Sequence, residues 1–177
     1  MTQAVNYQNW MYRRIEPYLG QRILEVGAGI GNFTRFLLDR ELVVPTDISE
    51  ICLNQLQERL GEALRVQPKL LDLGNPTDKD WNQYDFDTVI CLNVLEHVED
   101  DACALSFINS VLKPGGRSVL LVPAFMFLFG SVDTAIGHFR RYTRRTLVPR
   151  MVEAGFLLQT TFYMNMIGMA GWFWNNR

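Results

Sequence analysis

The sequence has few of the residues that build metal clusters and disulfide frameworks. Its 177 residues include two histidines and three widely spaced cysteines, Cys52, Cys91 and Cys103. It contains neither a Cys-x-x-Cys pair nor a His/Cys cluster, so the pattern predicts no metal site. An odd number of cysteines, two of them in apolar runs, is typical of free thiols in a reducing cytoplasm.

A strong charge of one sign is absent too. The net charge is −2 and the isoelectric point is near 5.7, so no overall field favours nucleic-acid binding. The polar segment Met1–Asn9 lacks the basic and apolar regions of a secretory signal, and we expect a cytoplasmic protein. Repeats and Pro/Gly/Ser-rich linkers are also missing. The length therefore predicts a single domain over residues 1–177.

Short β-branched runs alternate with helical patterns along the chain. Strands are predicted at 22–26, 42–44, 65–73, 87–92 and 118–122, and apolar helical stripes at 33–37, 52–60 and 104–112. This alternation predicts a doubly wound α/β fold, in which a mostly parallel, Rossmann-like sheet lies between two helical layers. The expected strand order is 3-2-1-4-5. A helix over about 5–19 precedes this core, which extends to about residue 165.

Two prolines test this topology. Pro68 lies inside the third predicted strand, which fits only if that strand is at the edge of the sheet. Pro45 follows an interior strand, so we expect it beyond the last ladder hydrogen bond of that strand.

The strongest local signal is a glycine loop between the first strand and the helix predicted after it. It reads Glu25-Val-Gly27-Ala-Gly29-Ile-Gly31, and glycines at such a turn let a ligand approach the backbone closely. Gly31-Asn-Phe33 lacks the Lys-Ser/Thr of a P-loop. Asn32 occupies the position of the third glycine of a dinucleotide fingerprint. The loop therefore favours a nucleoside without pyrophosphate over a nucleotide or nicotinamide cofactor.

Two aspartates follow strands that end at the same edge. Asp47 closes the second strand, where a carboxylate can accept hydrogen bonds from both hydroxyls of a ribose. Asp72, at the end of the third strand, is placed to bind an exocyclic adenine amine. The alternative for each residue is a turn or capping aspartate.

In order, these motifs resemble those of class I S-adenosylmethionine-dependent methyltransferases. The matching segments within residues 20–123 are Glu25 to Gly31, Asp47, Leu71-Asp-Leu73, Tyr84 to Leu92 and Lys113-Pro-Gly-Gly116. The resemblance implies S-adenosylmethionine as cofactor and S-adenosylhomocysteine as product. It also implies the cofactor-binding residues, namely Glu25, Gly27, Ala28, Gly29, Asp47, Ile48, Asp72, Leu73 and Asn93.

The same resemblance assigns a role to most of these residues. Gly27 and Gly29 would pass under the methionine part of the cofactor, with Glu25 fixing their loop. Asp47 would hold the ribose. Asp72 and Leu73 would meet the adenine, and Asn93 would lie beside the methionine.

Two histidines compete for a catalytic role. Methyl transfer needs aligned reactants, and it needs a base only when the acceptor is protonated. His97 follows the fourth strand in a Glu-His-Val segment that lies beside the cofactor in related enzymes, and nearby acids favour its charged form. His138 lies in Gly137-His-Phe-Arg-Arg-Tyr142, which resembles an acceptor-side segment of a bacterial small-molecule subset. We predict His138, ahead of His97, as base or acceptor-positioning group; a structural histidine is the alternative.

Arginines are concentrated just after His138. Arg140 and Arg141 are predicted to bind a carboxylate or phosphate of the acceptor, with Tyr142 beside them. The later arginines, Arg144, Arg145 and Arg150, are typical of a solvated helix face.

Apolar and aromatic residues gather at both ends of the chain. In the N-terminal stripe, Tyr7 or Tyr12 is a candidate to touch the cofactor, and simple packing on the sheet is the alternative. The apolar tail 156–177 is too interrupted for a membrane span. It predicts a sixth strand near 157–163 and then a core or interface helix, which allows a homodimer. Since the family's last strands look incomplete, we expect a truncated chain.

The sequence thus predicts a methyltransferase acting on oxygen or nitrogen of a small molecule, without nucleic acid. The alternative from another class is a non-catalytic Rossmann-like module that binds a nucleoside or a partner. A nicotinamide oxidoreductase is the third alternative, because Asn32 replaces the third glycine of the dinucleotide fingerprint.

Overall fold

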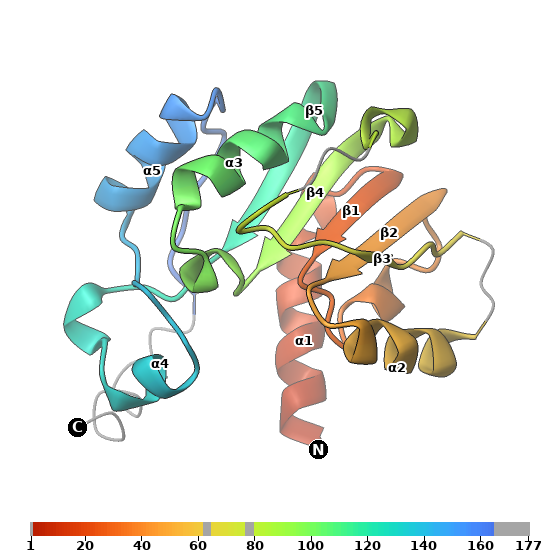
Figure 1. Cartoon of the computed structure of the whole chain (residues 1–177), viewed down its shortest axis with the longest axis horizontal. Helices are drawn as coiled ribbons and strands as arrows, with labels where there is room; N and C mark the ends of the chain where they lie inside the picture. The colour runs from red at the N-terminus through yellow and green to blue at the C-terminus, as the bar shows by residue number, and fades with distance from the viewer. Residues whose placement is uncertain (1, 62–64, 77–79, 165–177) are drawn as a thin grey trace.

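A computed structural model describes residues 2–61, 65–76 and 80–164 of the chain. At its centre is a parallel five-stranded sheet in the order β3-β2-β1-β4-β5 (Figure 1). The strands are β1 (Arg22–Val26), β2 (Leu42–Asp47), β3 (Lys69–Leu70), β4 (Phe86–Leu92) and β5 (Leu112–Leu121). The predicted doubly wound topology and strand order are confirmed.

Helices cover both faces of this sheet. The α-helices are α1 (Thr2–Ile15), α2 (Glu50–Leu60), α3 (Asp101–Ser110), α4 (Ser131–Ala135) and α5 (Arg144–Glu153). Single 3₁₀ turns connect them: η1 (Glu16–Tyr18), η2 (Thr34–Phe36), η3 (Asn82–Tyr84), η4 (Leu95–His97) and η5 (Met126–Leu128). None of the described helices is long and apolar enough to cross a membrane.

The strands build two cores because successive side chains point to opposite faces of the sheet. On one face, Ile23, Val43 and Ile90 pack with Met11 and Ile15 of α1. On the other, a second cluster combines alternate strand positions with the apolar side of α3: Leu24, Val44, Val89, Leu105 and Ile108. Figure 1 shows α1 and α3 on opposite sides of the sheet. This burial fixes the register of the strands, since a one-residue slip would exchange the side chains that pack on the α1 face with those that pack on the α3 face.

The two prolines have different outcomes. Pro68 precedes β3, which is an edge strand as predicted. The expectation for Pro45 was wrong: it pairs with Glu25 inside β2, and the ladder continues to Asp47. The amide of Val43 donates toward the β3 side, to the carbonyl of Arg65. Because strand amides alternate sides, the hydrogen bond that Pro45 cannot donate lies on that same side, where β3 is short and interrupted.

The helix predicted around Phe33, Phe36 and Leu37 is only the 3₁₀ turn η2. Amides 36 and 37 donate three residues back, to carbonyls 33 and 34, and β2 begins at Leu42, which leaves little chain for a longer helix. The burial of Phe33 and Leu37 against α1 is nevertheless as the apolar spacing indicated. Tyr12 stacks on Phe36 at 5.0 Å, in agreement with the packing alternative for the N-terminal stripe.

Three further strand boundaries differ from prediction. The third strand shrinks from 65–73 to Lys69–Leu70 with an isolated bridge at Val66. β5 is assigned from Leu112, but its regular pairing with β4 begins at Arg117, after an irregularity over the Lys113–Gly116 turn.

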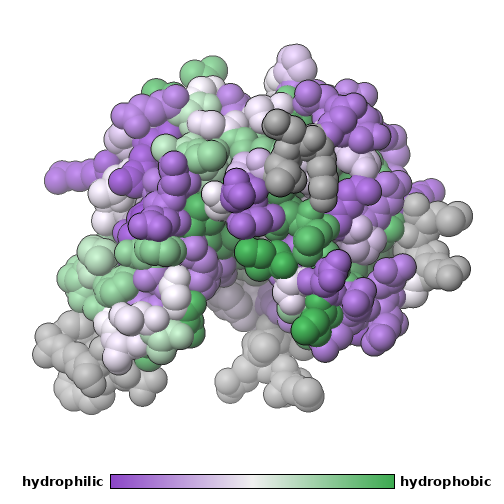
Figure 2. All heavy atoms as spheres, viewed as in Figure 1, coloured by the Kyte–Doolittle hydropathy of each residue, from purple (hydrophilic) through white to green (hydrophobic). Residues whose placement is uncertain are grey.

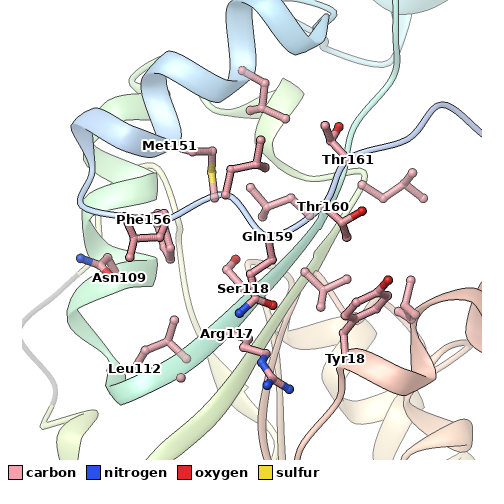
Figure 3. A pocket seen from close by; sticks show the side chains of 18 of the residues that line it. Tyr18, Asn109, Leu112, Arg117, Ser118, Met151, Phe156, Gln159, Thr160 and Thr161 are labelled. Carbon is pink, nitrogen blue, oxygen red and sulfur yellow. The ribbon is translucent and has the colours of Figure 1, made fainter.

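The third difference is the sixth strand, since residues 157–163 form none. The segment and β5 line the same cavity of about 650 Å³, with Gln159 and Thr160 from the segment and Arg117 and Ser118 from β5 (Figure 3). The carbonyl of Thr161 accepts a hydrogen bond from Arg144 of α5, which takes the place of a ladder bond there. The tail helix predicted after Tyr163 lies outside the described residues, except for its first position.

Candidate functional site

The ends of four strands lie together at one edge of the sheet. Val26 of β1 pairs with Thr46 of β2 and with Cys91 of β4, while Asp47 pairs with Leu70 of β3. The segments that follow these strands therefore meet at the carboxyl edge, where ligands bind in open α/β sheets. All the residues predicted to bind the cofactor lie there.

Asp47 is in direct contact with the glycine loop. Its Oδ2 accepts a hydrogen bond of 2.9 Å from the amide of Gly29, and its Oδ1 accepts one of 2.9 Å from the amide of Ser49. Ser49 in turn caps α2 by accepting from the amide of Cys52. The carboxylate is thus held between the loop and α2, where the predicted ribose contact requires it.

The three glycines of the loop all have positive φ but different surroundings. A Cβ on Gly27 (φ +73°) would lie 2.2 Å from Val94 Cγ2. One on Gly31 (φ +81°) would lie 3.0 Å from Leu56 of α2. One on Gly29 (φ +55°) would meet no described atom within 4 Å. Gly27 and Gly31 therefore permit close packing, whereas Gly29 faces open space in which a ligand fits.

The remaining cofactor residues border the same loop. Ile48 follows Asp47 at the end of β2 and is 68% exposed. Asp72 is exposed, and its Oδ1 accepts from the amide of Gly74, while Leu73 is buried. Asn93 adopts the left-handed conformation (φ +55°) directly after β4. Non-glycine residues in that region are concentrated at functional sites.

Glu25 is the most buried ionisable group beneath the loop. It is 3% exposed, and its Oε2 has no hydrogen-bond partner among the described residues. Burial raises the pKa of Glu25 to about 7. The structure gives no hydrogen bond from Glu25 to the described loop residues, so its predicted role in fixing the loop remains a prediction.

A Glu25→Gln variant is expected to change how stability depends on pH. Since the folded-state pKa lies above the ordinary value, the folded protein binds the proton more tightly. The contribution of Glu25 to stability is complete below about pH 4.5 and is lost as the pH rises through about 7. The free energy of unfolding of the variant should therefore increase relative to that of the wild type between pH 5 and pH 8, as measured by urea unfolding. A constant difference across this range would contradict the raised pKa.

The two histidines, predicted as rivals, are neighbours. Their ring centroids lie 4.6 Å apart in an edge-to-face arrangement. His97 ends η4, directly after β4, and the loop carrying His138 is tied to η4 by a hydrogen bond from the amide of Phe139 to the carbonyl of Glu96. Burial and the nearby His138 lower the pKa of His97, opposite to the shift expected from the acidic run. That run acts elsewhere: Asp100 caps α3, and Asp101 pairs with arginines.

His138 contacts a buried carboxylate that also pairs with an arginine. Its Nδ1 lies 2.8 Å from Oδ1 of Asp133, which is fully buried. Asp133 also receives both Nε (2.8 Å) and Nη2 (3.0 Å) of Arg141. Arg141 is therefore a buried structural partner in this structure, and its predicted contact with the acceptor remains a prediction.

Arg140 and Tyr142 converge on another carboxylate. Nη1 of Arg140 lies 3.1 Å from Oδ2 of Asp101, and the Tyr142 hydroxyl donates to the same oxygen at 2.9 Å. Tyr142 is 2% exposed, and burial raises its pKa. These contacts join the loop to α3; binding of the acceptor by Arg140 or Tyr142 remains a prediction.

Sequence reasoning missed the part played by Glu96. This residue is 1% exposed, its Oε1 lies 3.9 Å from His138 Nε2, and its Oε2 has no hydrogen-bond partner among the described residues. One ligand atom each from Glu96, His97 and His138 lies within 4.8 Å of the others, and the absence of a metal site remains a prediction. The available signal in the sequence was the adjacent pair Glu96-His97. The third residue of the cluster, His138, lies far along the chain.

Known proteins resemble this chain in sequence and in fold. Residues 24–118 match the family model described as a methyltransferase domain. A highly reducing polyketide synthase from Leptosphaeria maculans is 32% identical over 133 residues, which are 68% of this chain but 5% of the synthase. The ubiquinone/menaquinone biosynthesis C-methyltransferase UbiE of Vibrio parahaemolyticus is 35% identical over 112 residues, covering 58% of this chain and 41% of UbiE. The chain thus spans less than half the length of either relative.

The arrangement of the elements agrees with solved structures. An S-adenosylmethionine-dependent methyltransferase from Mesorhizobium loti superposes with a TM-score of 0.69 at 21% identity, covering 86% of this chain and 83% of that one. The family match ends before Gly137–Tyr142, so the resemblance of that segment to a bacterial subset remains a prediction. With the glycine loop, Asp47 and the strand order all in place, the chain belongs to the methyltransferase domain family, of the class I type that uses S-adenosylmethionine.

Proposed function

We propose that this domain transfers a methyl group from S-adenosylmethionine to oxygen or nitrogen of a small molecule. The observation that carries the proposal is the hydrogen bond from the Gly29 amide to Asp47 Oδ2. It joins the glycine loop to the carboxylate expected to hold the ribose. The open space beside Gly29 and the exposed Ile48 fit an adenosine there.

The acceptor side is formed by the loop after β5. Val94, whose side chain faces Gly27, is followed at once by η4 with Glu96 and His97. The histidine pair therefore lies next to the cofactor loop, and His138 is the proposed acceptor-positioning group, with His97 beside it. The bound cofactor supplies the methyl group as a sulfonium, and the chain aligns the acceptor and excludes water.

The surface around His138 favours an apolar acceptor. Figure 2 shows apolar residues on the lobe formed by η5 and α4. Met126, Phe127, Ile136 and Phe139 are each about half exposed or more in this lobe, at 53%, 67%, 50% and 48%. Exposed apolar patches of this kind mark binding sites more often than isolated surface residues do.

Transfer to carbon is the second candidate, favoured by the similarity to UbiE, which is named a C-methyltransferase. S-adenosylmethionine with a ¹³C-labelled methyl group separates the cases, because methyl carbons on oxygen, nitrogen and carbon have distinct chemical shifts. Phenols, amines and 1,3-diketones serve as acceptor probes. Cofactor binding without transfer to any probe would favour the non-catalytic module.

An Asp47→Ala variant is expected to bind S-adenosylhomocysteine about 10- to 100-fold more weakly, because charge-assisted hydrogen bonds to the ribose are lost. Isothermal titration calorimetry measures this directly. Asp47→Asn keeps one acceptor for the Gly29 amide, so its affinity for S-adenosylhomocysteine should lie between those of the wild type and Asp47→Ala. Glu58→Ala, at an exposed position on α2, is the matched control. Equal affinity of wild type and Asp47→Ala would remove Asp47 from the cofactor site and with it the main support for the proposed function.

A further inference from the structure

We propose that Glu96, His97 and His138 form a binding site for a divalent transition-metal ion beside the cofactor loop. The three residues come from two segments, η4 and the loop after α4, which the fold brings together. One ligand atom from each lies within 4.8 Å of the other two. Two imidazoles and one carboxylate form the donor set of catalytic zinc sites and of other first-row divalent ions.

Glu96 supplies the buried carboxyl ligand. Its side chain is 1% exposed, and Oε2 has no hydrogen-bond partner among the described residues. An unsatisfied buried carboxylate oxygen is costly, so a cation bound there would relieve that cost. The other oxygen, Oε1, faces His138 Nε2 at 3.9 Å.

His138 is oriented as a metal-ligating histidine. Its Nδ1 contacts Oδ1 of Asp133 at 2.8 Å, and its other ring nitrogen, Nε2, lies 3.9 Å from Glu96 Oε1. A carboxylate accepts and does not donate, so in the neutral ring this contact suits a proton on Nδ1, with Nε2 as the metal ligand. A carboxylate behind the histidine is the usual outer partner in zinc sites, where it fixes the tautomer and the ring. Arg141 neutralises Asp133, so this second carboxylate does not need to compete for the metal.

The three ligand atoms lie farther apart than they would around a bound ion, since they are within 4.8 Å of one another. Zinc–nitrogen and zinc–oxygen bonds of about 2.0–2.2 Å place tetrahedral ligand atoms about 3.3–3.5 Å apart. The Oε1–Nε2 separation of 3.9 Å must therefore shorten by about half an ångström. His97 is exposed, so its ring has room to move toward Glu96 and His138, as binding of an ion requires. Three protein ligands leave a fourth position open.

That open position has a clear use if the proposed function is correct. Val94, which follows β4 just before η4, would lie 2.2 Å from a Cβ on Gly27, so the metal site adjoins the loop expected to hold the methyl donor. A metal ion there would bind an acceptor oxygen and lower its pKa. His138 then acts as a positioning ligand and not as the base. Metal binding itself does not depend on the cofactor, and the test below uses none.

The experiment is a titration of the tag-free, chelator-treated chain with Co²⁺, followed by its visible absorption, and then displacement by Zn²⁺. We expect one Co²⁺ per chain with the d–d bands of a low-coordinate nitrogen/oxygen site. Glu96→Gln and His97→Ala should each weaken Co²⁺ binding by at least about tenfold. Removing a residue that only contacts a metal ligand already costs about 10- to 100-fold in affinity, and these two residues would be ligands themselves. Glu96→Gln preserves the shape of the buried side chain, and His97 is exposed, so both variants are expected to fold, as circular dichroism will check.

The controls separate this site from adventitious binding. The chain has only these two histidines, so no other imidazole competes. Cys103→Ser removes the exposed thiol and should leave Co²⁺ binding unchanged. Absence of the d–d bands, or bands that persist in both Glu96→Gln and His97→Ala, would overturn the metal site. Since calorimetry with S-adenosylhomocysteine tests the cofactor site separately, either proposal can fail without the other.

Discussion

Replacing Arg141 by alanine is expected to lower the free energy of unfolding by about 3–5 kcal/mol, the cost of leaving one buried charge of a pair without its partner. Asp133 is fully buried, and Arg141 contacts both of its carboxylate oxygens. Removing the guanidinium leaves this carboxylate with His138 and the amide of Gly130. Urea unfolding at pH 7.5 measures the loss.

The matched control is Arg145→Ala, at an exposed position on α5. It removes the same charge from the surface and should change stability by less than about 0.5 kcal/mol. The comparison also tests the prediction that Arg141 binds the acceptor. A variant with wild-type stability and a raised KM for the acceptor would favour that prediction, whereas a large stability loss favours the ion pair seen in the structure.

The sheet could be predicted from sequence because its signals are local and repeated. Each interior strand is a short β-branched run, and the order follows once βαβ units alternate along the chain. Boundaries were less accurate where tertiary constraints decide them. The turn η2 is short because β2 begins soon after it, and Pro45 is tolerated because its missing amide faces the interrupted edge strand. No periodicity in the sequence carries that information.

The cofactor side of the site could be predicted from sequence, whereas the acceptor side could not. Gly29 and Asp47 each follow a predicted strand, so the topology alone implied that they meet. The acceptor side depends on a loop whose path is not set by any repeat. Asp133 and Glu96 therefore emerged as partners of His138, and Arg141 as a partner of Asp133, only in the structure. The two arginines that the sequence assigned to the acceptor, Arg140 and Arg141, pair with Asp101 and Asp133 within the chain.

Alanine substitutions at Gly27 and Gly29 should separate packing from ligand binding. Both residues have positive φ, so both variants incur backbone strain of about 1–2 kcal/mol. Only Gly27→Ala adds a collision, since its Cβ would lie 2.2 Å from Val94 Cγ2. Overpacking typically costs about 1–3 kcal/mol more, so we expect Gly27→Ala to lower the free energy of unfolding by about 2–5 kcal/mol.

Gly29→Ala has the opposite profile because its Cβ would meet no described atom within 4 Å. Its methyl group projects into the space where the cofactor is expected, so stability should change little beyond the backbone strain. Affinity for S-adenosylhomocysteine should fall by about 10- to 100-fold, as for overpacking at a binding surface. Thermal unfolding with and without S-adenosylhomocysteine measures both quantities in one series. If Gly29→Ala bound the ligand as tightly as wild type, the open space beside this residue would not be the cofactor site, and the loop would serve packing alone.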